Sequence, residues 1–241
     1  MNSHQPPQPD PLHAGRQAVD IKVSWWVLAW RQMCHRFVVK SVGVSVFMTV
    51  FFSAYFHLLR HPISTPLLMP LTPLDTALVF HPWALVLYLS LWFYVAIAPI
   101  MQASLRALVH YGLWIGALCF TGLALFYFWP TSVPAFDSSA YPEFAVLQGI
   151  DSAGNACPSL HVATAAFSAY WNRQLLRELG AGRSWQWINA LWFLLIAWST
   201  MAVKQHVVLD VLAGLVLAAA FIAMSRFDMG RRGNGTLGQG Q

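Results

Sequence analysis

The sequence predicts an all-α integral membrane protein with six transmembrane helices in a bundle and both termini in the cytoplasm. Its 241 residues are 57% hydrophobic and only 10% charged, and its mean hydropathy is +0.52. Soluble domains carry about 25% charged residues, so a soluble protein is excluded. The apolar runs are continuous and do not alternate with period two, which favours helices over barrel strands.

Windows of roughly 20 apolar residues locate the predicted spans. They lie near residues 38–59, 79–100, 107–129, 158–175, 186–204 and 206–225.

The positions of the basic residues predict the orientation. With the N-terminus inside, the outer side holds only Arg60 and Lys204, and the other twelve of the 14 Lys and Arg residues are inside. This asymmetry follows the positive-inside rule and places both termini in the cytoplasm. The long loop 130–157 has no Lys or Arg, as an outer loop should. Because the net charge of +5 is spread over every inner loop, it does not indicate a nucleic-acid surface.

The flanks of the membrane domain, 38–226, have a different composition. Residues 1–20 lack the apolar core of a signal peptide and are expected to be a disordered tail. Residues 21–37 mix Trp with basic residues, which predicts an amphipathic helix in the inner interface, although a simple extension of the first span fits equally well. The Gly-rich residues 227–241 are expected to be a disordered tail.

Two polar residues mark the start of the last span, in "STMAVKQHVVLDVLAG". His206 and Asp210 are four apart, so on a helix they share one face. An acidic residue inside an apolar run is a functional candidate by default. Asp210 is placed to hold one nitrogen of His206 and leave the other free to attack or to accept a proton.

A second polar group marks the start of the fourth span, in "NACPSLHVATAAFSAYW". The predicted topology puts Ser159 and His161 on the same outer side as His206. Helix N-termini present free N–H groups and a positive dipole end, so these two helix starts are expected to bind an anion such as phosphate.

These residues resemble the type 2 phosphatidic acid phosphatase superfamily, which has a PSGH-like motif and a later SRxxxxxHxxxD motif. Here "PSLH" matches the first motif, and Ser199, His206 and Asp210 keep the spacing of the second. The "KQH" and the upstream "TPLDTALVFHPWALVLYLSLWFYV" look like the branch of inositol phosphorylceramide synthases and, more distantly, sphingomyelin synthases.

The resemblance implies a role for each matching residue. His206 matches the nucleophile that forms a phosphohistidine, Asp210 the residue that orients it, and His161 the acid that protonates the leaving oxygen. Ser159 matches a phosphate ligand. The implied function is a membrane lipid phosphatase or phosphotransferase that acts on a lipid phosphate or phospholipid without metal or cofactor. The implied location is a bacterial inner membrane, with the active site facing the periplasm.

The chain departs from the family at its phosphate-binding arginines. Thr200 stands at the arginine of the second motif, Ala135 stands where related proteins often have one, and the KxxxxxxRP motif is absent. Lys204 is therefore predicted as the main phosphate-binding cation, with Arg60 as a weaker candidate.

Other interpretations compete with these assignments. A catalytically impaired relative, or a small-solute or proton transporter using His206 and Asp210, is the alternative function. A metal or haem site would have three ligands in His161, His206 and Asp210, but a dedicated ligand cluster is not apparent. Cys157 is interpreted as structural, Asp75 is not assigned as catalytic, and the oligomeric state is left open.

Overall fold

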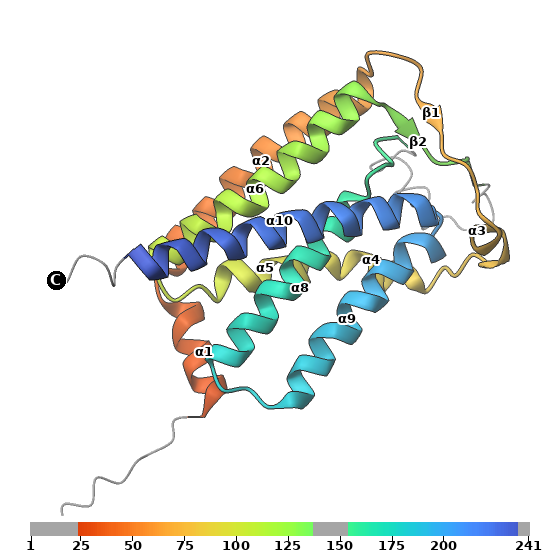
Figure 1. Ribbon diagram of the computed structural model, residues 1–241. Coiled ribbons are helices and arrows are strands. Elements are labelled where there is room, and N and C mark those ends of the chain that lie inside the picture. The colour runs from red at the N-terminus through yellow and green to blue at the C-terminus, as the bar shows by residue number, and fades with distance from the viewer. Residues whose placement is uncertain (1–23, 137–153, 236–241) are drawn as a thin grey trace, which may run out of the picture.

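A computed structural model describes residues 24–136 and 154–235 and is mostly helical (Figure 1). The predicted tail 1–20, the end of the C-terminal tail at 236–241, and loop residues 137–153 lie outside the described part. The helices are α1 (Trp25–Cys34), α2 (Phe37–Arg60), α3 (Pro73–Ala77), α4 (Ala84–Leu89), α5 (Leu91–Ile100), α6 (Leu105–Phe128), α8 (Leu160–Glu178), α9 (Arg183–Ala202) and α10 (Val208–Gly235). Two short strands, β1 (Leu67–Leu68) and β2 (Thr131–Ser132), pair in parallel.

Three of the described helices are long and apolar enough to cross a membrane. They are Phe37–Arg60, Leu105–Phe128 and Val208–Asp228. They coincide with the first, third and sixth predicted spans, and they indicate a membrane protein.

The second predicted span, 79–100, is shorter and divided. Its helical part is Ala84–Ile100, which is apolar but below the length of a full span. The division between α4 and α5 falls at Ser90, whose hydroxyl donates to the carbonyl of Leu87 and accepts from the indole N–H of Trp192. A side chain bonded in this way competes with the backbone pattern of a continuous helix.

The fourth and fifth predicted spans form α8 and α9, which are long enough to span but less apolar than α2, α6 and α10. The reason in α8 is its central position, because it packs against α5, α6, α9 and α10. Its buried Ser168 lies 3.3 Å from the hydroxyl of Tyr111, and Asn172 donates to the carbonyl of Tyr94 at 3.5 Å. A helix enclosed by such partners need not be uniformly apolar. The count of six spans therefore stays a prediction.

The N-terminal helix is separate from the first span. Arg36, between α1 and α2, has a φ of 54°, in the left-handed region. The buried Lys40 then ties three elements together, since its ammonium donates to the carbonyl of Gln32 at 2.6 Å and to that of Ile100 at 2.7 Å. Whether α1 lies in a membrane interface stays a prediction.

The two ends of the bundle differ in what they carry. Figure 1 shows α1 and the C-terminal end of α10 at one end, and α3, β1 and β2 at the other. Helix α10 continues to Gly235, past the boundary expected at residue 226. Which end faces the cytoplasm stays a prediction.

Candidate active site

The N-terminal ends of α8 and α10 are in close contact. The backbone N–H of Ser159 donates to the carbonyl of Asp210 at 3.0 Å. A Cβ atom at Gly214 would lie only 2.5 Å from the carbonyl oxygen of Ser159, so the approach requires glycine there. Ser159 is also the N-cap of α8, because its side-chain oxygen accepts from the N–H of Val162 at 3.3 Å.

This contact brings the two predicted histidines and the aspartate together. His206 Nε2 lies 3.4 Å from His161 Nδ1, and His206 Nδ1 lies 3.4 Å from Asp210 Oδ2. Asp210 is fully buried and His206 is 7% exposed. The three side chains therefore form one line, with His206 in the middle.

The buried carboxylate determines which nitrogen of His206 carries the proton. Asp210 Oδ2 accepts from the N–H of Val207 at 3.0 Å, whereas Asp210 Oδ1 and His206 Nδ1 have no hydrogen-bond partner among the described residues. A carboxylate on this side favours the proton on Nδ1, which leaves the lone pair on Nε2, facing His161.

Cys157 lies close to this line but is a poor nucleophile. Burial first, and then the negative charge of Asp210, raise the pKa of Cys157 to about 11. Its thiol is therefore protonated at neutral pH, whereas a reactive cysteine needs a thiolate. This agrees with the structural role expected for Cys157.

The line continues to a tyrosine that the sequence did not reveal. The hydroxyl of Tyr88, in α4, lies 2.8 Å from Nε2 of His161, and the two rings are 4.8 Å apart between centroids. With the tautomer above, His161 donates from Nδ1 to His206, and its Nε2 accepts the Tyr88 O–H. Tyr88 stands inside an apolar stretch, and no spacing rule links it to a histidine 73 positions later.

Asp75 stabilises the turn that contains His206. Its Oδ1 accepts from the N–H of Val208, the first residue of α10, at 2.8 Å. Its Oδ2 accepts from the N–H and the hydroxyl of Thr72, which caps α3. Two N–H groups at the start of α10, those of Val207 and Val208, are therefore bound to carboxylates. That helix start has fewer donors left for a phosphate than the sequence led us to expect.

Lys204 lies in the same turn, with a φ of 58°. Its ammonium donates to the carbonyls of Asp75 at 3.1 Å and of Leu78 at 2.5 Å. An ammonium has three N–H donors, so one remains for another acceptor. Thr200 is fully buried, and its hydroxyl donates a hydrogen bond to the carbonyl of Ala197. Arg60 is at the end of α2, with its guanidinium 5.7 Å from the ring centroid of Phe56.

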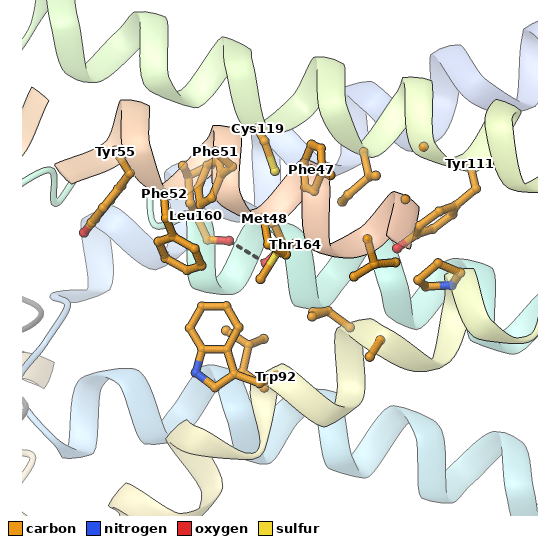
Figure 2. Close-up of a pocket in the computed structure, with 18 of the residues that line it drawn as sticks. Phe47, Met48, Phe51, Phe52, Tyr55, Trp92, Tyr111, Cys119, Leu160 and Thr164 are labelled. Carbon is orange, nitrogen blue, oxygen red and sulfur yellow. Dashed lines mark hydrogen bonds between the residues drawn. The ribbon is translucent and has the colours of Figure 1, made fainter. Parts of the chain in front are cut away.

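A large apolar cavity reaches the histidines. It has a volume of about 640 Å³ and lies between α2, α5, α6 and α8, with His161 and His206 among its lining residues. Figure 2 shows aromatic side chains of α2, including Phe52 and Tyr55, on one side of this space and Trp92 of α5 on the other, and the ring centroids of Phe52 and Trp92 are 5.4 Å apart.

The structure thus brings His161, His206 and Asp210 together, with Ser159 buried beside them and Lys204 in the adjoining turn. Their chemical roles stay predictions, as does the absence of a metal or cofactor. Tyr88 and the bracing role of Asp75 were missed, because both depend on contacts between residues far apart in the chain.

Comparison with known proteins supports part of the resemblance found in the sequence. The family model of the PAP2 superfamily matches residues 126–233, which include "PSLH", His206 and Asp210. Comparisons with curated proteins and with solved structures found no match. The narrower likeness to inositol phosphorylceramide synthases stays a prediction. From the end of α6 to the end of α10, the chain is similar to the PAP2 superfamily, whose members are generally phosphoesterases or phosphotransferases.

Proposed function

We propose that the protein cleaves a phosphoester of a membrane lipid through a phosphohistidine on His206, at the outer face of the membrane. The observation that carries this proposal is the line of Asp210, His206 and His161, built where two helix starts meet. Such a line contains an oriented nucleophile and a proton donor, which are the two groups that phosphoester cleavage needs.

In the first step, the lone pair of His206 Nε2 attacks phosphorus. A nitrogen–phosphorus bond forms, the bond from phosphorus to the leaving oxygen breaks, and His161, which carries a proton on both ring nitrogens in the complex with substrate, gives that oxygen its Nδ1 proton. Asp210 stabilises the positive charge that develops on the ring of His206. A carboxylate in this position holds the ring in the reactive tautomer and supports its charged form.

The two rings must separate for this step. At 3.4 Å, His206 Nε2 and His161 Nδ1 are in contact, and a phosphoryl group does not fit between them. The substrate therefore replaces an internal contact on binding. After the step His161 is neutral and can take the proton from the incoming hydroxyl.

In the second step, that hydroxyl attacks phosphorus and the nitrogen–phosphorus bond breaks. Water as acceptor makes the protein a phosphatase, and an alcohol makes it a phosphotransferase. The proposed mechanism is the same for water and for an alcohol as the acceptor.

Ser159 and Lys204 are the proposed phosphate ligands. The third N–H of Lys204 is the nearest cationic donor in the turn before His206, and the start of α8 adds its positive dipole end. Ser159 contributes mainly by shaping that helix start, because its oxygen already caps α8.

The alternative functions receive less support. The cavity next to the histidines is lined mainly by apolar side chains. A path for protons or small solutes would instead need polar groups through the depth of the membrane. An impaired relative would keep the histidines but give no turnover, which the following experiment detects.

The test measures turnover and the covalent intermediate together. Purified protein is incubated with a panel of phospholipids and lipid phosphates, with and without inositol or diacylglycerol as acceptor. We expect a phosphorylated protein that is labile in acid and is not formed by His206→Ala. Asp210→Asn should lower the rate by about a hundredfold or more, as for a misoriented base.

Ala220→Leu is the control, because this residue is exposed on α10 away from the site. It should behave as the parent protein does. Full activity in His206→Ala would overturn the proposal.

A further inference from the structure

The cavity is long and has two distinct ends. Along α2 its lining residues run from Phe56, at the end of α2 that Asn155 contacts, to Val39. This stretch of helix is about 25 Å long, at 1.5 Å per residue. The cavity therefore extends along most of α2.

The polar groups along its wall are bonded within the protein. The hydroxyl of Thr164 donates to the carbonyl of Leu160 at 2.8 Å, the contact drawn in Figure 2. The hydroxyl of Tyr111 lies 3.3 Å from that of Ser168. With these groups occupied, the wall presents hydrocarbon to whatever lies in the cavity, so an apolar occupant is favoured.

Lys40 lies at the far end. Its side chain is 2% exposed, and its ammonium is held by the carbonyls of Gln32 and Ile100. These bonds connect α1, α2 and α5, so three elements meet at this end of the cavity. A hydrocarbon chain that extends from the histidines along α2 reaches these residues.

Two glycines line the end of the cavity near Lys40. Gly43, one turn from Lys40, and Gly112, in α6, are among its lining residues, and both are exposed. A Cβ atom at either position would have no other heavy atom within 4 Å. The cavity is therefore open to the surface beside these two residues, and a larger side chain at either position would narrow it.

We propose that this cavity binds one hydrocarbon chain of the lipid substrate in an extended form, and that Gly43 and Gly112 set the longest chain that fits. The inference rests on the proposed function, because it places the phosphate of the same lipid at His206. The volume of about 640 Å³ lies within the range of about 300–1,000 Å³ typical of ligand pockets.

The test narrows the deep end and measures chain-length preference. Gly43→Leu and Gly112→Leu each place a branched side chain in open space, and leucine suits a helix better than glycine does, so both variants should fold. The substrates are n-alkyl phosphates from octyl to octadecyl, at a fixed mole fraction in detergent micelles. We expect each variant to lower the ratio of kcat/KM for hexadecyl over decyl phosphate by about tenfold or more. That factor is the equivalent of about 1.4 kcal/mol, at the low end of the cost of overpacking.

A binding measurement makes the test independent of catalysis. An octadecyl phosphate with a terminal photoreactive diazirine is crosslinked to His206→Ala. We expect labelling near Gly43 and Lys40, and loss of that labelling when Gly43→Leu is added. Ala220→Leu, on the exposed face of α10, is the matched control and should leave both the labelling and the chain-length profile unchanged.

The outcomes separate the two proposals. If turnover depends on His206 but neither leucine variant changes the chain-length profile, the chain site is wrong. If labelling near Lys40 is found but no substrate is turned over, the proposed function fails and the chain site remains. If neither turnover nor labelling is found, both are overturned.

Discussion

Tyr88 fixes the orientation of His161 from the side opposite His206. Its hydroxyl is 2.8 Å from Nε2 of His161, and its side chain is only 3% exposed. A hydroxyl can donate to Nε2 of the neutral ring and can accept from the Nε2–H of the protonated ring, so in both states it holds Nδ1 of His161 toward His206. In the proposed mechanism Nδ1 is the proton donor to the leaving oxygen, so Tyr88 acts as a positioning residue.

Removing this hydroxyl should therefore affect protonation more than binding. We expect Tyr88→Phe to lower kcat by about tenfold, with KM little changed. This is less than the factor of about a hundred or more for loss of a general acid itself, because His161 remains. The pH dependence of kcat should also shift, because the Nε2 of His161 loses its hydrogen-bond partner. A purely structural role would instead lower the melting temperature and leave the pH profile of the remaining activity unchanged.

Lys204 combines a structural task with a proposed contact to phosphate, and vanadate binding reports on the second. Its carbonyl contacts hold the segment after α3 against the turn before α10, and its third N–H is the proposed phosphate donor. We expect Lys204→Ala to weaken vanadate binding by about tenfold to a hundredfold, the loss of one charged hydrogen bond of about 1.5–3 kcal/mol. Arg60→Ala should change vanadate binding little. Equal vanadate affinity in Lys204→Ala and the parent would assign Lys204 to structure alone.

Among elements, the decisive contact is the one between the starts of α8 and α10. Their approach at Ser159 and Gly214 places His161 against His206, and Asp75 in α3 then braces the start of α10. Because these contacts join the helices at their ends, a small separation there disrupts the candidate site without unfolding the bundle.

A pair of alanine substitutions tests this contact. Gly214→Ala would put a Cβ atom 2.5 Å from the carbonyl oxygen of Ser159, so one helix must move. We expect it to destabilise the protein by about 1–3 kcal/mol, the usual cost of overpacking, and to reduce turnover. Gly112→Ala, with no atom within 4 Å, should instead stabilise the protein by up to about 1 kcal/mol through helix propensity. Thermal unfolding in detergent measures both, and similar melting temperatures for the two variants would contradict the close contact.

The sequence was informative where a pattern is local. Hydropathy located three helices long enough to span, and the four-residue spacing of His206 and Asp210 predicted their proximity, although His206 stands two residues before α10 and not on its face. Hydropathy was less informative for α8. Its buried Ser168 and Asn172 form hydrogen bonds with residues far away in the chain, and hydropathy counts a polar side chain without its hydrogen bonds. Asp75 was set aside for the same reason, since its contact with Val208 joins residues that no periodicity connects.

At the scale of the whole molecule, the candidate site and the described ends of the chain lie apart. Helix α3 and the strands are at one end of the bundle, and α1 and the end of α10 are at the other (Figure 1). If the positive-inside rule holds, the site faces away from the cytoplasm.

Reporter fusions test this orientation directly. A reporter fused after residue 146 should be active on the outer side, and one fused after residue 180 on the cytoplasmic side, because α8 lies between them. Residue 146 itself lies outside the described residues, so this fusion also tests the predicted position of the outer loop. The same result from both fusions would rule out that α8 crosses the membrane.

The depth of the cavity has a consequence for how the protein would meet its substrate. Drawing a sixteen-carbon chain into water would cost about 13 kcal/mol, at about 0.8 kcal/mol per methylene. A cavity that lies among apolar helices and ends at Lys40 offers that chain a path from lipid to protein that avoids water. Encounter then takes place by diffusion within the plane of the bilayer. The turnover rate should follow the mole fraction of substrate in the membrane, and diluting the vesicles in buffer should leave it unchanged.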